Sequence, residues 1–291
     1  MKTKLLILGS SGLIGHQVLN YFENLGTYEI INISRNLKGN NSTLLFDLSD
    51  NEELKAIILD FRPELVINCA GILIKGSEND IKSSILLNAH LPHFLTKLLN
   101  EYGGKLIHIS TDCVFSGARG GYKELDEKDG VSIYSKTKSL GEVNDDKHLT
   151  IRTSVVGPEL KAQSEELLNW YLYQEGEING FEKSVWSGVS SCFLPIAIEN
   201  LIVHNVTGLY QVTSSIPITK YELLCLFKKF TRKTNTINRV PGYLTNKSLI
   251  DTRKLLTIPI PSYEEMIEDM FFIIKNNIQD RYSHYKSILH D

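Results

Sequence analysis

A glycine-rich loop directly after the first apolar run is the feature that most limits what this chain can fold into. Residues 9–15 read GSSGLIG, with an apolar run before them and an amphipathic helical pattern after them. Glycines at this spacing permit a tight turn, let backbone N–H groups approach a pyrophosphate, and allow helix and strand to pack closely. The loop therefore predicts the first βαβ unit of a dinucleotide-binding domain. Its candidate cofactor-binding residues are Gly9, Ser11, Gly12, Leu13, Ile14 and Gly15.

Strand and helix patterns alternate through the first half of the chain. Apolar runs typical of buried strands lie at residues 4–8, 29–33, 65–69, 105–109 and 149–152. Helical patterns lie between them at residues 52–60 and 81–101. This alternation predicts an α/β fold, a doubly wound parallel sheet of the Rossmann class.

The second half has a looser pattern that predicts a smaller C-terminal lobe. Helical patterns lie at residues 164–174, 219–230 and 263–276, and a strand pattern lies at 209–213. We expect a Rossmann domain over residues 1–156. Residues 157–291 should form mainly a substrate-binding lobe, with some segments returning to the first domain. The polar tail after Asn277 is expected to fray.

Composition narrows the class of ligand. The chain has 291 residues, 42% of them hydrophobic, and a net charge of −3, which favours a large core and argues against binding nucleic acid or an anionic membrane. No stretch approaches the roughly 20 apolar residues of a transmembrane helix. The four cysteines lie far apart, and His90 and His93 lack a further ligand at metal spacing. We expect a cytoplasmic protein with a small-molecule ligand and no metal, and a homodimer stays open.

The end of the second predicted strand bears on cofactor choice. A site selective for NAD places an acidic residue about 20 residues after the glycine loop, where it binds the ribose hydroxyls. This chain has Ser34 and Arg35 there. A hydroxyl and a guanidinium suit a 2′-phosphate, so NADPH is favoured and NADH is the alternative. Further candidate cofactor contacts at strand ends are Asp47, Leu48, Cys69, Ala70 and Gly71.

Three residues after the fifth strand pattern suggest acid–base chemistry. Thr111 follows that strand, and Tyr134 and Lys138 are spaced to share one face of a helix. An ammonium near a phenol favours the phenolate, so we expect Lys138 to lower the pKa of Tyr134. Thr111 is placed to hydrogen-bond the same reacting oxygen. These are the candidate catalytic residues, and Tyr134 and Lys138 are also candidate cofactor contacts.

These segments resemble the extended short-chain dehydrogenases, and among them the dTDP-4-dehydrorhamnose reductases. The resemblance rests on GSSGLIG, on STDCVFSG at residues 110–117, on YKELD at 122–126, on YSKTKSLGE at 134–142 and on RTSVVGP at 152–158. It continues through WSGVS at residues 186–190 and through Gly208-Leu209-Tyr210, so it covers nearly the whole chain.

The resemblance implies a reductase for a nucleotide-linked 4-keto-6-deoxy sugar, with a role in surface polysaccharides such as O-antigen. Tyr134 would deliver a proton to the keto oxygen, Lys138 would bind the nicotinamide ribose, and Thr111 would orient the carbonyl. Asp112 and Cys113 would border the sugar. Trp186 is expected either to stack on the sugar or base or to fill the interface between lobes.

Two departures from the reductase pattern bear on the substrate. Cys113 stands where these reductases often have tyrosine, and Ser135 stands where they often have glycine. Both UDP- and dTDP-linked sugars stay open, and the WSGVSS segment favours UDP slightly.

Competing functions differ at the same positions. The related dehydratases carry glutamate where this chain has Cys113, and a thiol is a poor base, so dehydration is disfavoured. An NAD-dependent epimerase would use the same Thr111, Tyr134 and Lys138. A non-catalytic NADP-binding regulatory subunit, like that of methionine adenosyltransferase, is the alternative from another functional class.

Overall fold

The chain forms two units in a computed structural model that describes residues 2–35, 43–162, 164 and 166–289. The first unit comprises Met1–Ser116, Glu127–Arg152 and Leu201–Gln211. The second comprises Gly117–Asp126, Thr153–Asn200 and Val212–Asp291. Each unit therefore draws on segments that are far apart in the sequence.

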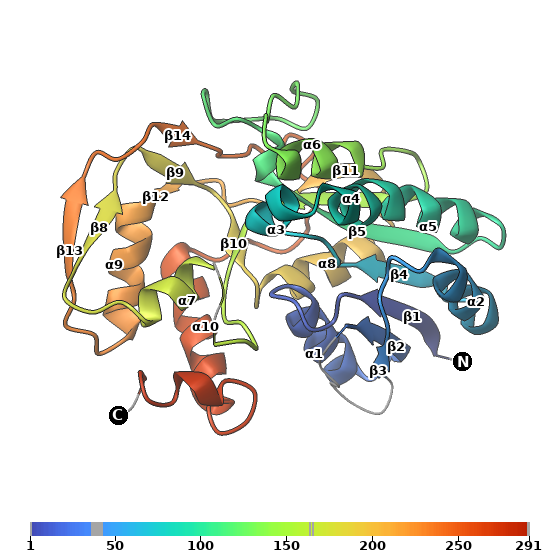
Figure 1. The fold of residues 1–291 in the computed structure, drawn as a ribbon, viewed down its shortest axis with the longest axis horizontal. Helices are drawn as coiled ribbons and strands as arrows, with labels where there is room; N and C mark the ends of the chain where they lie inside the picture. The colour runs from blue at the N-terminus through green and yellow to red at the C-terminus, as the bar shows by residue number, and fades with distance from the viewer. Residues whose placement is uncertain (1, 36–42, 163, 165, 290–291) are drawn as a thin grey trace. The chain divides into compact units, whose positions relative to one another are not determined.

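A seven-stranded sheet forms the centre of the first unit, with the order β11-β6-β5-β4-β1-β2-β3 (Figure 1). The pairings β2–β3, β1–β2, β1–β4, β4–β5 and β6–β11 are parallel. The strands are β1 (Thr3–Leu8), β2 (Tyr28–Ser34), β3 (Thr43–Leu45), β4 (Leu65–Asn68), β5 (Lys105–Thr111), β6 (Leu149–Thr153) and β11 (Gly208–Gln211). Strand order reverses between β1 and β4, and ligands of doubly wound sheets bind at the carboxyl ends of the strands at such a point. The predicted α/β class is confirmed.

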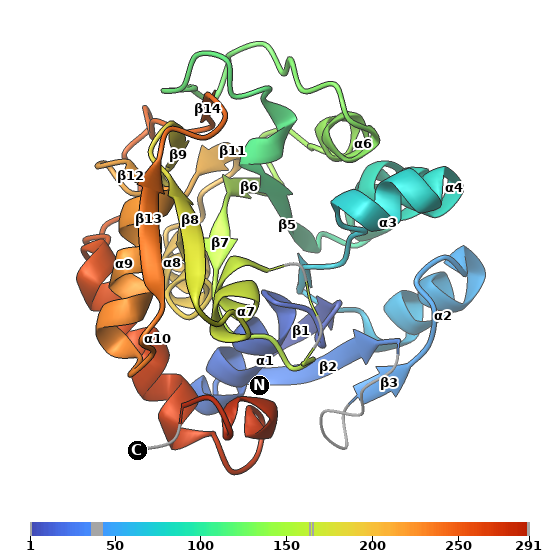
Figure 2. The same ribbon diagram turned by 60° about the vertical axis from the view of Figure 1, so that its left-hand side comes forward.

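Helices cover both faces of this sheet (Figure 2). One face carries Leu6 and Leu8, which lie in a core cluster with Leu54 of α2 and Leu95 of α5. Successive strand residues point to opposite faces, and Ile7 is as fully buried as its neighbours. The helical elements of this unit are α1 (Gly15–Leu25), α2 (Asn51–Phe61), α3 (Ile74–Asn79), α4 (Ile81–Ser84), η1 (Ile85–His90), α5 (Leu91–Asn100), η2 (Asp112–Val114) and α6 (Ile133–Leu140).

The helix expected over residues 81–101 is present from Ile81 to Asn100, but it is not α-helical throughout. An α-helical turn, α4, is followed by the π-helical segment η1 and then by α5. Pro92 at the start of α5 lacks an N–H and cannot extend an α-helical ladder backwards from that position. Short π segments within helices are frequent at functional sites.

The second unit holds three small sheets, with orders β10-β7, β12-β9-β14 and β13-β8. Its strands are β7 (Val155–Val156), β8 (Glu177–Phe181), β9 (Ser184–Trp186), β10 (Val189–Ser190), β12 (Ile218–Thr219), β13 (Thr236–Val240) and β14 (Thr245–Asn246). Its helices are α7 (Leu167–Leu172), α9 (Lys220–Phe230), α10 (Tyr263–Asn276) and the short η3 (Ser283–Tyr285), and α8 (Leu194–Val203) runs from this unit into the first.

The C-terminal tail packs into the core of the second unit. Tyr282 and Tyr285 are 1% and 0% exposed and belong to the same cluster as Phe227 of α9 and Met270 of α10. The expectation that the tail frays after Asn277 is therefore wrong for the described residues up to 289. Leu289 belongs to the same cluster, and Ile278 and Ile288 pack against it, so apolar and aromatic side chains anchor this segment.

Candidate active site

The glycine loop brings the ends of β1 and β4 into close contact. Gly9 has a φ of +76°, and a Cβ at this position would lie 2.8 Å from the backbone nitrogen of Ala70. A Cβ on Gly15 would lie 2.0 Å from the carbonyl oxygen of Gly9. A side chain at Gly9 would clash with the loop after β4, and a side chain at Gly15 would clash with the start of the glycine loop itself. The glycines thus hold the loop tightly folded at the point where the strand order reverses.

The start of α1 offers backbone donors next to this loop. In the described part of the chain, no backbone or side-chain acceptor is found for the N–H groups of Leu13 and Ile14. Ser34, at the end of β2, donates a hydrogen bond from its hydroxyl to that of Ser11 at 2.8 Å. N–H groups at a helix start form a natural anion site.

Arg35 and Asp47 lie near each other at the ends of β2 and β3. The N–H of Ser49 donates to the Asp47 carboxylate at 2.9 Å. This backbone hydrogen bond is the main cause that lowers the pKa of Asp47, and the charge of Arg35 adds to it. Arg35 is exposed, whereas Leu48 is buried in the core of the unit.

The loop after β4 lies beside the catalytic candidates. Cys69 is half-buried, and burial of its thiol raises the pKa to about 12, with the Lys138 ammonium acting in the opposite direction. Ala70 is buried, and a Cβ on Gly71 would lie 3.0 Å from the side-chain oxygen of Asn88. The neutral thiol makes Cys69 a poor nucleophile.

Thr111, Tyr134 and Lys138 come together at the carboxyl end of β5. Thr111 is the last residue of β5, and its hydroxyl accepts a hydrogen bond from the N–H of Cys113 at 3.1 Å. Tyr134 and Lys138 lie four residues apart on α6, whose start is capped by the Ser132 hydroxyl. Tyr134 is hydrogen-bonded to Thr111. The structure therefore groups the two hydroxyls and the amine.

The pKa of Tyr134 shifts in the opposite direction to the one expected from sequence. Burial raises it, and the nearby Cys113 adds to the increase, while the hydrogen bond with Thr111 acts against it. The expected lowering by Lys138 is wrong for this structure, because desolvation of the phenolate dominates. Tyr134 is thus a protonated phenol at neutral pH, which suits a proton donor.

Lys138 is buried between β5 and the loop after β4. Its ammonium donates to the carbonyl oxygen of Ile109 at 2.7 Å and lies 3.5 Å from Nε2 of His108. Burial lowers the pKa of Lys138 to about 8, while Glu142 and Cys69 oppose this decrease. A group with this pKa is largely protonated at neutral pH and close to its titration range.

A buried ion pair supports the same strand end and was not identified from the sequence. The Ser110 hydroxyl donates to Glu142 at 2.7 Å, and Arg152 donates to both carboxylate oxygens at 2.9 and 2.8 Å. The side chains of Arg152 and Glu142 are 1% and 3% exposed. Glu142 and Arg152 lie within motifs used for the family resemblance, but nothing in their local pattern predicted that they pair.

Asn88 is a second residue that the sequence did not single out. It lies in η1, donates to the carbonyl oxygen of Ile72 at 3.0 Å, and accepts from the N–H of the same residue at 2.8 Å. It also donates to the Thr137 hydroxyl at 3.3 Å, so it links the loop after β4 with α6. The only sequence feature that could have indicated this role was an asparagine within an apolar helical stripe.

The predicted substrate residues have different surroundings. Asp112 is buried, and Cys113 is half-buried beside Thr111. Trp186 belongs to the second unit, where it is 5% exposed and donates from its indole N–H to the Ser154 hydroxyl at 2.8 Å. Its ring packs on Tyr263, with centroids 5.6 Å apart. These contacts favour a packing role for Trp186 within its unit, and its contact with substrate stays a prediction.

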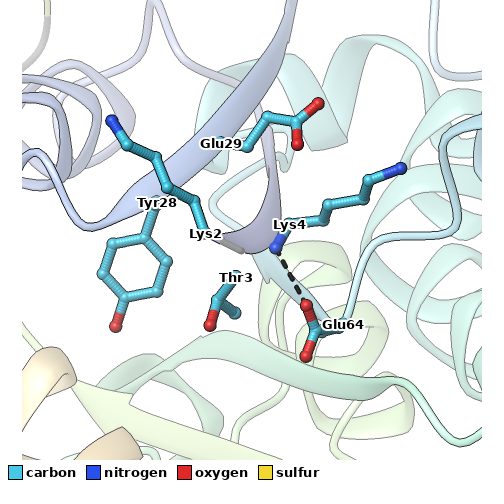
Figure 3. A pocket seen from close by; sticks show the side chains of 6 residues that line it. All are labelled: Lys2, Thr3, Lys4, Tyr28, Glu29 and Glu64. Atoms are coloured by element: carbon cyan, nitrogen blue, oxygen red, sulfur yellow. Dashed lines mark hydrogen bonds between the residues drawn. The ribbon is translucent and has the colours of Figure 1, made fainter.

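An open hollow of about 570 Å³ lies at the opposite ends of the strands (Figure 3). It is lined by Lys2, Thr3, Lys4, Tyr28, Glu29 and Glu64. The backbone N–H of Lys4 donates a hydrogen bond to the Glu64 carboxylate at 3.2 Å, drawn as a dashed line in Figure 3. Since these residues begin β1 and β2 and precede β4, the hollow is separated from the glycine loop by the length of the strands.

The described residues hold neither a metal-binding cluster nor a membrane-spanning helix. No group of three or more His, Cys, Asp or Glu side chains in this part of the chain is arranged to hold a metal ion. Within the same residues, no helix is both long and apolar enough to cross a membrane.

Comparison with known proteins gives relatives with different functions. The dTDP-4-dehydrorhamnose reductase of Aggregatibacter actinomycetemcomitans is 27% identical over 141 residues, which are 48% of this chain and 45% of that protein. Methionine adenosyltransferase 2 subunit beta of Danio rerio is 25% identical over 243 residues, covering 76% of this chain and 72% of that protein. The chain thus spans less than half the length of the bacterial reductase that it matches.

A solved structure shares the fold over almost the whole chain. The dTDP-4-dehydrorhamnose reductase of Bacillus anthracis, solved in complex with NADP, has a TM-score of 0.81 and 21% identity. The match covers 94% of this chain and all of that one. The RmlD substrate binding domain family matches residues 3–172, which is more than half of the sequence. The chain belongs to the RmlD substrate binding domain family and has the fold of the extended short-chain dehydrogenases.

Proposed function

We propose that this protein is an NADPH-dependent reductase of a nucleotide-linked 4-keto-6-deoxy sugar. One observation carries the proposal: Thr111, Tyr134 and Lys138 are grouped at the carboxyl end of β5, in the same unit as the glycine loop. A protonated phenol hydrogen-bonded to a threonine hydroxyl is suited to binding and protonating a carbonyl oxygen.

The residues present fit a dinucleotide. The space around Gly9 and Gly15 excludes a Cβ, and the N–H groups of Leu13 and Ile14 are available for a pyrophosphate. Ser34 and Arg35 would hold the 2′-phosphate, and the exposed guanidinium favours NADPH over NADH. Asp47, Leu48, Cys69, Ala70 and Gly71 are proposed to border the rest of the cofactor. When bound, NADPH supplies a hydride to a carbonyl carbon.

The chain's own groups provide the proton and the orientation. Tyr134 donates its phenolic proton to the keto oxygen, while the Thr111 hydroxyl donates a hydrogen bond to the same oxygen. Lys138 carries a positive charge close to the site, because Glu142 opposes the effect of burial on its pKa. That charge favours the transient phenolate of Tyr134 and a hydrogen bond to the nicotinamide ribose.

The finer points of the proposal concern the sugar and its use. Asp112 and Cys113 border the sugar, and both UDP- and dTDP-linked substrates fit the argument, with UDP preferred from the WSGVSS segment. The product would serve surface polysaccharides such as O-antigen. None of the four cysteines forms a disulfide, and the proposed setting is a reducing cytoplasm.

Turnover with defined keto sugars tests the proposal. The protein should oxidise NADPH, followed by absorbance, with either a UDP- or a dTDP-linked 4-keto-6-deoxy sugar. Tyr134→Phe should reduce kcat by roughly 100- to 10,000-fold, the usual contribution of a general acid. Lys136→Met, an exposed change on the same helix, is the control and should leave kcat unchanged. NADPH binding without oxidation of any such sugar would refute the reductase.

A regulatory subunit is the second candidate, favoured by the longer match to methionine adenosyltransferase 2 subunit beta. In that case the protein would bind a methionine adenosyltransferase catalytic subunit and change its kinetics without turning over a sugar. Size-exclusion chromatography of the mixture, followed by an adenosyltransferase assay, separates the two functions. An epimerase is less favoured, because Arg35 suits an exchangeable NADPH.

A further inference from the structure

Two polar side chains lie opposite each other inside the central sheet. Asn68 at the end of β4 is the register partner of His108 on β5, and both are 0% exposed. The side-chain nitrogen Nδ2 of Asn68 lies 3.2 Å from Nδ1 of His108. A buried polar pair in the middle of an apolar sheet lowers stability unless its hydrogen bonds are complete.

The direction of these hydrogen bonds is fixed at one end. The backbone N–H of Ala70 donates to Oδ1 of Asn68 at 3.1 Å. A backbone N–H can only donate, so the amide oxygen of Asn68 faces Ala70 and its NH₂ group faces His108. Nδ1 of His108 must then accept. The neutral imidazole therefore carries its proton on Nε2.

That proton points toward the amine of Lys138. Nε2 of His108 lies 3.5 Å from Nζ of Lys138, which also donates to the carbonyl oxygen of Ile109 at 2.7 Å. An imidazole N–H that faces an ammonium group disfavours the extra proton on the amine, whereas a neutral amine can accept from it. The hydrogen bonds that run from Ala70 through Asn68 to His108 therefore disfavour the protonated form of Lys138.

We propose that Asn68 and His108 are a positioning pair. Through this directed chain of hydrogen bonds, the pair fixes the orientation of Lys138 and disfavours the protonated form of its amine. The inference rests on the proposed role of Lys138 in the reductase. Neither residue touches the reacting atoms, so both act through the amine.

The other groups around the pair are consistent with this assignment. Burial lowers the pKa of His108 well below its usual range, and the charges of Lys138 and His93 add to the decrease, so the ring stays neutral. Around Lys138, burial lowers the pKa, while Glu142, just after the end of α6, and Cys69, after β4, oppose the decrease. His108 is the neutral donor among these groups.

The tautomer can be measured without substrate or cofactor. In protein labelled with ¹⁵N-histidine, His108→Gln identifies the His108 signals by their loss. We expect a neutral ring with its proton on Nε2 that does not titrate between about pH 5 and 8, the range in which an unperturbed histidine changes charge. Asn68→Asp should move the proton to Nδ1, because the carboxylate accepts where the amide donated. A proton on Nδ1 in the unsubstituted protein would overturn the proposal.

The effect on Lys138 is read from the pH profile of NADPH oxidation. With Nε2 turned into an acceptor by Asn68→Asp, the pKa of Lys138, about 8 in the structure, should rise. The alkaline limb of kcat should then move to higher pH by about one unit. His148→Gln, which replaces another buried histidine whose Nδ1 accepts from the N–H of Leu106, should leave the limb in place.

The outcomes separate the inference from the proposed function. If no keto sugar is reduced, the proposed function fails, while the tautomer still tests the directed chain. If the tautomer reverses in Asn68→Asp but the alkaline limb does not move, the positioning pair is refuted. If Asn68→Asp does not fold, the tautomer of the unsubstituted protein decides.

Discussion

Replacing Glu142 by Gln should lower the unfolding free energy by about 3–5 kcal/mol, the usual effect of removing one partner of a buried ion pair. Arg152 is 1% exposed and donates two of its hydrogen bonds to the Glu142 carboxylate. Its guanidinium also lies 4.8 Å from the ring of Phe115, and its burial means that water does not hydrate the charge. The uncompensated charge of Arg152 is the source of the loss.

Denaturant titration at neutral pH measures this effect against two controls. Glu264→Gln breaks an ion pair with Lys229 in which both side chains are 55% exposed, and should cost about 1 kcal/mol or less. Combining Glu142→Gln with Arg152→Met should recover much of the loss, because no charge is left buried. If Glu142→Gln and Glu264→Gln had equal effects, the reasoning from burial would be refuted.

The effect of Glu142→Gln on the unfolding free energy should depend on pH. Burial would raise the pKa of Glu142, but the hydrogen bonds and charge of Arg152 outweigh it and hold the pKa below its usual range. A carboxyl with a lowered pKa stabilises the fold above its unfolded-state pKa, about 4.3, and loses this contribution as the pH falls. The difference between the unsubstituted protein and Glu142→Gln should therefore shrink below about pH 4.3.

Three further predictions follow from the loops and buried acids. Gly15→Ala should weaken NADPH binding more than tenfold in a fluorescence titration, since its Cβ would lie 2.0 Å from the Gly9 oxygen. Gly26→Ala, with nothing within 4 Å of its Cβ, should leave binding intact and destabilise the fold by about 1 kcal/mol through its φ of +67°. Arg35→Ala should reduce the preference for NADPH over NADH by roughly 10- to 100-fold, the value of one charge-assisted hydrogen bond, and an unchanged ratio of kcat/KM values would contradict this. Burial raises the pKa of Glu166 to about 8. Its protonated form therefore stabilises the fold fully below the unfolded-state pKa, and this contribution is lost as the pH rises through about 8. Glu166→Gln should flatten this fall of the unfolding free energy in denaturant titrations, and an unchanged slope would contradict the assignment.

The sequence predicted the parts of the fold that depend on local pattern. The glycine loop, the strand runs and the Tyr134–Lys138 spacing each lie within one or two elements, so their period alone indicated a doubly wound sheet. Parallel strands bring their carboxyl ends to one edge, which is why Thr111 and the loop after β4 could each be predicted as ligand contacts at strand ends. The order of the strands in the sheet was not predicted and is known from the structure.

The supporting contacts could not be predicted in this way, because they depend on register and burial. Ser110 and Glu142 are 32 residues apart, and Asn68 and His108 are 40 apart. Their pairing depends on which strands are neighbours and on how they are aligned, which no local pattern contains. The direction of the Tyr134 pKa was missed for a related reason, since the sequence shows a neighbouring cation but not the extent of burial.

The sheet interior of the first unit is more polar than folding alone requires. Asn68, His108 and Arg152 are all fully buried on adjacent or nearby strands, where apolar side chains would pack without needing partners. Each is satisfied by hydrogen bonds that run toward the end of β5 or toward Lys138. Buried polar groups of this kind stabilise a fold little or not at all compared with apolar side chains of similar volume. Their position is better explained by what they hold: the strand end that carries Thr111 and the amine of Lys138, which the proposed acid–base chemistry needs in one orientation.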